Sequence, residues 1–124
     1  MTDQDLRLRS AGEASELQSE ILAAAAEGVA KRADGEQIAA RALANALVAV
    51  VQQYLRGHSS AEDVELFFEV HGRAPVDDPA AWPANILADL SRHQIPAQDM
   101  DTIRQSAVAT AVRYIRSASP LAWG

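Results

Sequence analysis

The chain has 124 residues, a hydrophobic fraction of 48% with only 5% aromatic residues, and a formal net charge of −6. A chain of this length forms one compact domain, and a core built from alanine, leucine, valine and isoleucine is typical of closely packed helices. The acidic charge disfavours nucleic acid as a partner, and the absence of cysteine excludes disulfides, cysteine metal sites and thiol catalysis.

The N-terminal segment MTDQDLRLRS, residues 1–10, is polar and lacks the apolar core of a signal peptide. We expect a flexible, irregular start, followed by a single helical domain over residues 11–124. No run approaches the roughly 20 apolar residues of a membrane span, so we expect a soluble cytoplasmic protein without a membrane partner. Apolar residues at helical spacing predict a first helix over residues 13–32; they are Leu17, Ile21, Leu22, Ala25 and Val29.

The clearest predicted element is a helix that follows Asp34 and ends on Gly57. Asp34 is suited to cap it, with Gln37 three residues later in a capping-box arrangement. Two adjacent apolar stripes cover more than half of its circumference, so the helix is either central or also faces another chain. The second alternative predicts a homodimer whose contact residues are Leu43, Leu47, Val50, Val51 and Tyr54.

A third helix is predicted to begin at Ser59, with Glu62 completing a second capping-box pattern. Gly72 is expected to end it. Phe67 and Phe68 are the two phenylalanines of the chain, and we expect both to anchor this short helix in the core.

The segment between Gly72 and Trp82 predicts a surface loop stiffened by Pro75 and Pro79. A stiff loop loses less conformational entropy on binding, and arginine and tryptophan often dominate the energetics of interfaces. We therefore expect a partner protein to bind here, the alternative being that Trp82 packs beneath the loop and the charges are solvated. With one residue of the apolar C-terminal tail, the expected partner-binding residues are Arg73, Asp77, Asp78, Trp82 and Trp123.

Two further helices, over residues 84–94 and about 98–117, complete an all-α fold: a compact bundle of about five helices, with antiparallel neighbours joined by short loops. The pair also leaves open a helix-turn-helix DNA-binding unit. The acidic sequence QDMD at the start of its second helix opposes that alternative. The polar residues near the turn are Arg92, His93, Gln94 and Arg104.

No motif in the chain demands a particular chemistry. Glycine-rich phosphate loops and Glu-x-x-His elements are absent. Asp89 with His93, and Glu69 with His71, are acid–histidine pairs at close spacing, which occur by chance on many polar faces. His58 precedes two serines that are better explained as helix caps. We therefore assign no catalytic, cofactor-binding or metal-binding residue and no cofactor.

By elimination, the sequence favours a small helical protein-binding module that acts as a regulator, an adaptor or an accessory subunit. The expected partner is another protein, with a homodimer as a further expectation. Two alternatives stay open: a helix-turn-helix DNA-binding regulator, and an enzyme with a carboxylate–histidine site.

Overall fold

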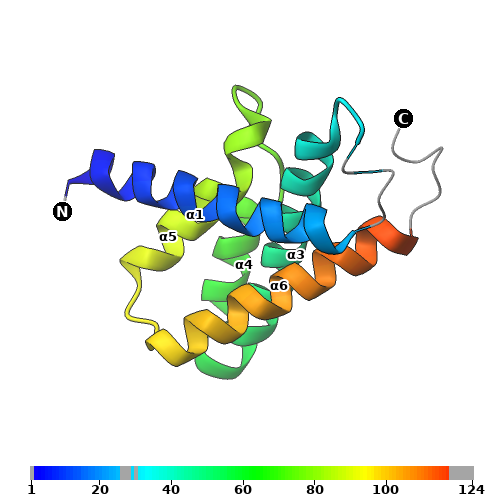
Figure 1. Ribbon diagram of the computed structural model, residues 1–124. Helices are drawn as coiled ribbons and strands as arrows, with labels where there is room; N and C mark the ends of the chain where they lie inside the picture. Colours follow the sequence, from blue (N-terminus) through cyan, green and yellow to red (C-terminus); the bar gives the residue numbers. More distant parts are fainter. Residues whose placement is uncertain (1, 26–28, 30, 118–124) are drawn as a thin grey trace.

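The structure is a computed structural model that describes residues 2–25, 29 and 31–117. Within these residues the chain folds into five α-helices and one short 3-10 helix, without a strand, which confirms the predicted all-α class (Figure 1). The elements are α1 (Asp3–Ala24), α3 (Gly35–His58), α4 (Ala61–His71), η1 (Pro79–Ala81), α5 (Trp82–Arg92) and α6 (Ala97–Ser117).

Helix α1 begins at Asp3, so the expectation that residues 1–10 are irregular is wrong for residues 3–10. Thr2 caps the helix: its hydroxyl oxygen accepts a hydrogen bond from the Asp5 backbone N–H at 3.1 Å, and the Asp5 carboxylate accepts one from the Thr2 N–H at 3.3 Å. The helix also ends earlier than predicted, at Ala24. The cap accounts for a helical start that apolar periodicity alone does not indicate.

Helix α3 is the centre of the fold. Helices α1 and α6 cross in front of it in Figure 1, and α4 and α5 also pack against it. Both predicted apolar stripes lie largely in the core. By length and composition α3 is the one described helix that could cross a membrane, yet 56% of its most apolar stretch is buried inside the protein. Its apolarity therefore serves core packing.

The residues expected to mediate self-association lie mostly inside this core. Leu43, Leu47 and Val51 are fully buried, and only Val50 and Tyr54 are partly exposed. The wide apolar arc of α3 is thus covered by the chain itself, which is the central-packing alternative left open by the sequence. The homodimer itself stays a prediction.

Two predicted helix caps are wrong in detail. Asp34 precedes α3, but its side chain makes no capping hydrogen bond. It pairs instead with the Arg32 guanidinium, at 2.8 Å and 3.1 Å, and this hydrogen bonding lowers the pKa of the Asp34 carboxyl. The charged fork of Arg32 outcompetes the backbone N–H groups for the carboxylate. Ser60, one residue later than predicted, caps α4 by accepting from the Asp63 N–H at 3.2 Å.

The two phenylalanines have different environments. Phe67 is 7% exposed and belongs to the core, whereas Phe68 is 50% exposed, so its predicted burial is wrong. Consecutive residues on a helix point about 100° apart, and the short helix α4 packs chiefly against α3 along one narrow side. That side accommodates one of the two rings.

Candidate functional site

A groove of about 770 Å³ lies between α4, the C-terminal end of α3 and the turn from α5 to α6. We call it the α4 groove. Three separate parts of the chain supply its apolar lining, so it exists only in the folded protein. The apolar lining residues are Leu55, Leu66, Phe67, Val70, Leu90, Ile95 and Pro96.

Two large aliphatic side chains of α4 are exposed at this groove. Leu66 is 59% exposed and Val70 is 60% exposed. The two residues are four apart on the helix and therefore lie on one face, side by side. Exposed apolar side chains that gather around a concave surface are typical of an interaction site, whereas a single one is ordinary.

The lining of the groove also contains acidic side chains. Asp63, Asp89 and Asp99 contribute carboxylates, and His58 and His93 are also present. With neutral histidines, the three carboxylates give the lining a charge of the same sign as the net charge of −6. A ligand with positive charge is therefore favoured at this site.

Tyr54 joins the end of α3 to the start of α6. Its hydroxyl donates a hydrogen bond to the Asp99 carboxylate at 2.9 Å. This hydrogen bond is the main cause that raises the pKa of Tyr54, and burial raises it further. The imidazole of His58 stacks on the Tyr54 ring, with ring centres 4.0 Å apart, and its Nδ1 lies 2.9 Å from the Tyr54 carbonyl oxygen. These contacts hold one end of the groove in place.

The hydrogen bond between Tyr54 and Asp99 predicts a pH effect. We expect the Asp99→Ala change to lower the pKa of Tyr54, since it removes the acceptor and the nearby charge. Because the folded-state pKa lies above the ordinary value of 10.0, this contact stabilises the protein below that pH and is lost as the pH rises through the raised pKa.

The phenolate absorbance of Tyr54 measures this pKa directly in a Tyr114→Phe background, which leaves Tyr54 as the single tyrosine of the chain. Asp101→Ala is the matched control, because Asp101 lies on the same helix and pairs with Arg104 instead. An unchanged titration in the Asp99 variant would contradict the assignment.

Asp89 lies between two histidines at the edge of the groove. Its Oδ2 lies 2.8 Å from His71 Nε2, and its Oδ1 lies 3.8 Å from His93 Nε2. The predicted proximity of Asp89 and His93 is therefore present. Glu69, by contrast, makes no described contact with His71, whose ring is buried and reaches across to α5. Within the described part of the chain, no cluster of three or more acidic, histidine or cysteine side chains is arranged to hold a metal ion.

His71 also connects the end of α4 to Trp82. The Trp82 indole N–H donates a hydrogen bond to the His71 carbonyl oxygen at 2.7 Å, and this contact is buried. His71 is the last residue of α4, so its carbonyl has no partner within the helix. The side chain of His71 and its carbonyl thus tie α4 to α5 at two points. This geometry supports a structural role for the histidine–aspartate pair.

The residues predicted to bind a partner occupy two different environments. Arg73, Asp77 and Asp78 are exposed, on the loop that projects from the helices at the top of Figure 1. Trp82 is 6% exposed and belongs to the core, which agrees with the alternative in which its ring is packed and not exposed. Trp123 lies outside the described residues. A binding role for the three charged loop residues stays a prediction.

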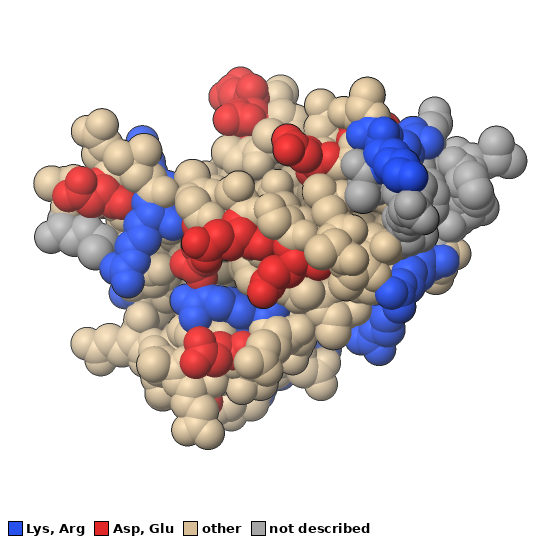
Figure 2. Space-filling view, in the orientation of Figure 1, with Lys and Arg blue, Asp and Glu red and all other residues tan. Residues whose placement is uncertain are grey.

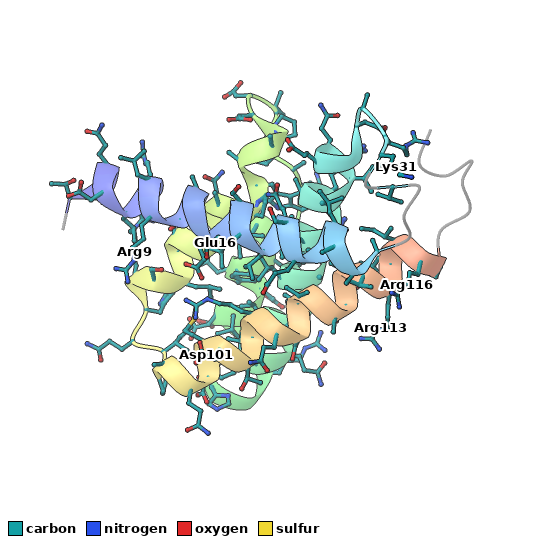
Figure 3. All side chains as sticks on the ribbon, in the orientation of Figure 1. Arg9, Glu16, Lys31, Asp101, Arg113 and Arg116 are labelled. Carbon is teal, nitrogen blue, oxygen red and sulfur yellow. The ribbon has the colours of Figure 1, made fainter. Side chains whose placement is uncertain are left out.

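The face between α1 and α6 is charged, and several of its charges are paired. Arg104 donates hydrogen bonds to Glu13 and to Asp101, the latter at 3.1 Å. Acidic and basic side chains alternate across this face in Figure 2, and Figure 3 shows Arg9, Glu16 and Asp101 along it. Arg104, a candidate DNA contact in the sequence, is thus engaged within the protein.

The other residues near the predicted helix-turn-helix turn have different surroundings. His93 and Gln94 line the α4 groove. Arg92 lies 3.9 Å from Asp3. None of these described contacts favours DNA binding over protein binding.

Sequence periodicity did not indicate the α4 groove, because the lining of the groove comes from four helices and a turn. The function therefore has to be argued from the groove itself. No known protein family, curated protein or solved structure is detectably similar to the chain.

Proposed function

We propose that the protein is a protein-binding module, acting as a regulator, an adaptor or an accessory subunit, whose α4 groove receives a helix of its partner. The observation that carries this proposal is the exposure of Leu66 and Val70, 59% and 60%, beside an apolar groove. A partner helix that inserts apolar side chains there would remove these two residues from water. Binding of an amphipathic helix in a hydrophobic groove is a common mode of protein recognition.

The charge of the groove lining specifies the kind of helix. Asp63, Asp89 and Asp99 line the groove together with its apolar residues, so a partner with lysine or arginine flanking its apolar face is complementary in charge. A second copy of the chain carries the same net charge of −6 and is disfavoured by that criterion. We therefore propose a basic amphipathic helix as the occupant of the groove.

A synthetic helical peptide with leucine on one face and lysine on the other tests this proposal. We expect it to bind and to shift the amide resonances of the residues that line the α4 groove. Leu66→Asp is expected to weaken binding by about tenfold or more, since burial of one leucine contributes about 1.5–3 kcal/mol. The added carboxylate would strengthen a purely electrostatic contact, so a loss of affinity identifies apolar insertion.

Val76→Asp is the matched control, because Val76 is 96% exposed and lies on the projecting loop outside the groove lining. We expect it to leave peptide affinity within about twofold of the unmodified protein. A peptide with glutamate in place of lysine should bind much more weakly. Resonance shifts confined to the α1–α6 face, or equal affinities for the Leu66 and Val76 variants, would refute the proposal.

A further inference from the structure

A second, smaller cavity gathers three arginines. It has a volume of about 320 Å³ and lies between α1, the end of α4, the following loop and α5. Arg7 comes from α1, Arg73 from the loop and Arg92 from the end of α5. We call this cavity the arginine pocket. The net charge of the chain is −6, so a cluster of three positive side chains is opposite in sign to the protein as a whole.

The positive charge of the arginine pocket is only partly compensated. Within the described residues, no hydrogen bond or ion pair involves Arg7 or Arg73. Arg92 lies 3.9 Å from Asp3, and both side chains are well exposed, so this pair contributes little. The carboxylate among the lining residues, Asp89, already contacts His71 at 2.8 Å. The lining residues alone, with three guanidinium groups and one carboxylate, carry a charge of about +2, and Asp3 beside Arg92 reduces this to about +1.

The remaining lining indicates the size and character of a ligand. Val70, Pro75, Trp82 and Ala88 give the cavity an apolar wall, and Asn85 adds an amide that can donate a hydrogen bond. A volume of about 320 Å³ is at the lower end of the range of small-molecule sites. The cavity thus combines a cationic side with an apolar side in a space suited to a small molecule.

We propose that the arginine pocket binds a small organic phosphate monoester. The guanidinium groups of Arg7, Arg73 and Arg92 would contact the phosphate, because the planar fork of arginine matches phosphate oxygens in two parallel hydrogen bonds. The organic group would lie against the wall that contains Trp82. This site goes beyond the protein-binding role of the α4 groove and does not depend on it.

Titration with phenyl phosphate, followed by amide resonances, tests the proposal. We expect saturable shifts at the lining residues, with weaker binding of inorganic phosphate and no binding of phenol. Arg7→Gln and Arg73→Gln are each expected to weaken binding of phenyl phosphate by tenfold or more, since each removes a charge-assisted contact. Leu66→Asp, which alters only the α4 groove, should retain phenyl phosphate binding.

Arg113→Gln is the matched control for charge. Arg113 lies near the C-terminal end of α6, on the opposite side of the molecule from the N-terminal part of α1 (Figure 3). It should leave the affinity within twofold. Absence of saturable binding, or equal weakening by the Arg113 and Arg73 variants, would overturn the proposal. Equal affinities for phenyl phosphate and inorganic phosphate would overturn the organic part of it.

Discussion

The Phe67→Ala variant is expected to lose about 3–5 kcal/mol in the free energy of unfolding, because it removes a buried ring and leaves a cavity. Phe67 is 7% exposed, lies in the core and contacts the His71 ring at a centroid distance of 5.1 Å. Denaturation by urea, followed by circular dichroism, measures this loss. The loss is a large fraction of the total stability of a domain of this size.

Phe68→Ala is the matched control for this prediction. It removes the same side chain from the adjacent residue of the same helix, but Phe68 is 50% exposed. We expect it to cost less than half of the Phe67 loss, because the ring gives up less burial and leaves no enclosed cavity. Equal losses in the two variants would contradict the orientation of α4.

The sequence predicted the helices whose apolar residues follow a regular period. The predicted bounds of the helix after Asp34 and of the helix that ends at Gly72 agree closely with the observed bounds of α3 and α4. The spacing of apolar residues along a short stretch of sequence indicates which residues lie on the same face of a helix. This spacing also showed that α3 has more apolar surface than a peripheral helix needs, which left central packing and self-association as the two explanations.

Apolar spacing in the sequence could not predict where α1 begins or that Phe68 is exposed. The inward residues at the start of α1 include Ser10, which is 1% exposed, and a small polar residue gives no apolar signal. Phe68 has the same hydrophobicity as Phe67, so composition cannot tell which of the two rings faces the core. That choice depends on where α4 lies relative to α3, which is a tertiary property.

The α4 groove could not be predicted from the sequence for a related reason. Its fixed contacts join residues far apart in the chain, such as Tyr54 with Asp99 and His71 with Asp89. Each partner is unremarkable in its own segment, since acidic and histidine residues occur on many helix surfaces. Asp89 and His93 were recognisable as neighbours because they are four apart on one helix. Contacts between helices become visible only when the packing is known.

Trp82 provides the second large effect expected from this packing. Trp82→Ala should lower the free energy of unfolding by about 3–5 kcal/mol, because the indole is 6% exposed and its loss leaves a cavity. It also leaves the His71 carbonyl, at the end of α4, without the hydrogen bond that the indole N–H supplies at 2.7 Å. An unsatisfied buried acceptor costs about 1–3 kcal/mol. We therefore expect the loss for Trp82→Ala to lie in the upper part of the range of about 3–5 kcal/mol.

Trp82→Phe separates these two contributions. Phenylalanine keeps most of the apolar ring but cannot donate to the His71 carbonyl, so we expect a loss of about 1–3 kcal/mol, smaller than that of alanine. Urea denaturation of both variants gives the two values. A Trp82→Ala variant as stable as the unmodified protein would show that the indole is not part of the core. It would then restore the sequence-based prediction that Trp82 belongs to an exposed binding surface.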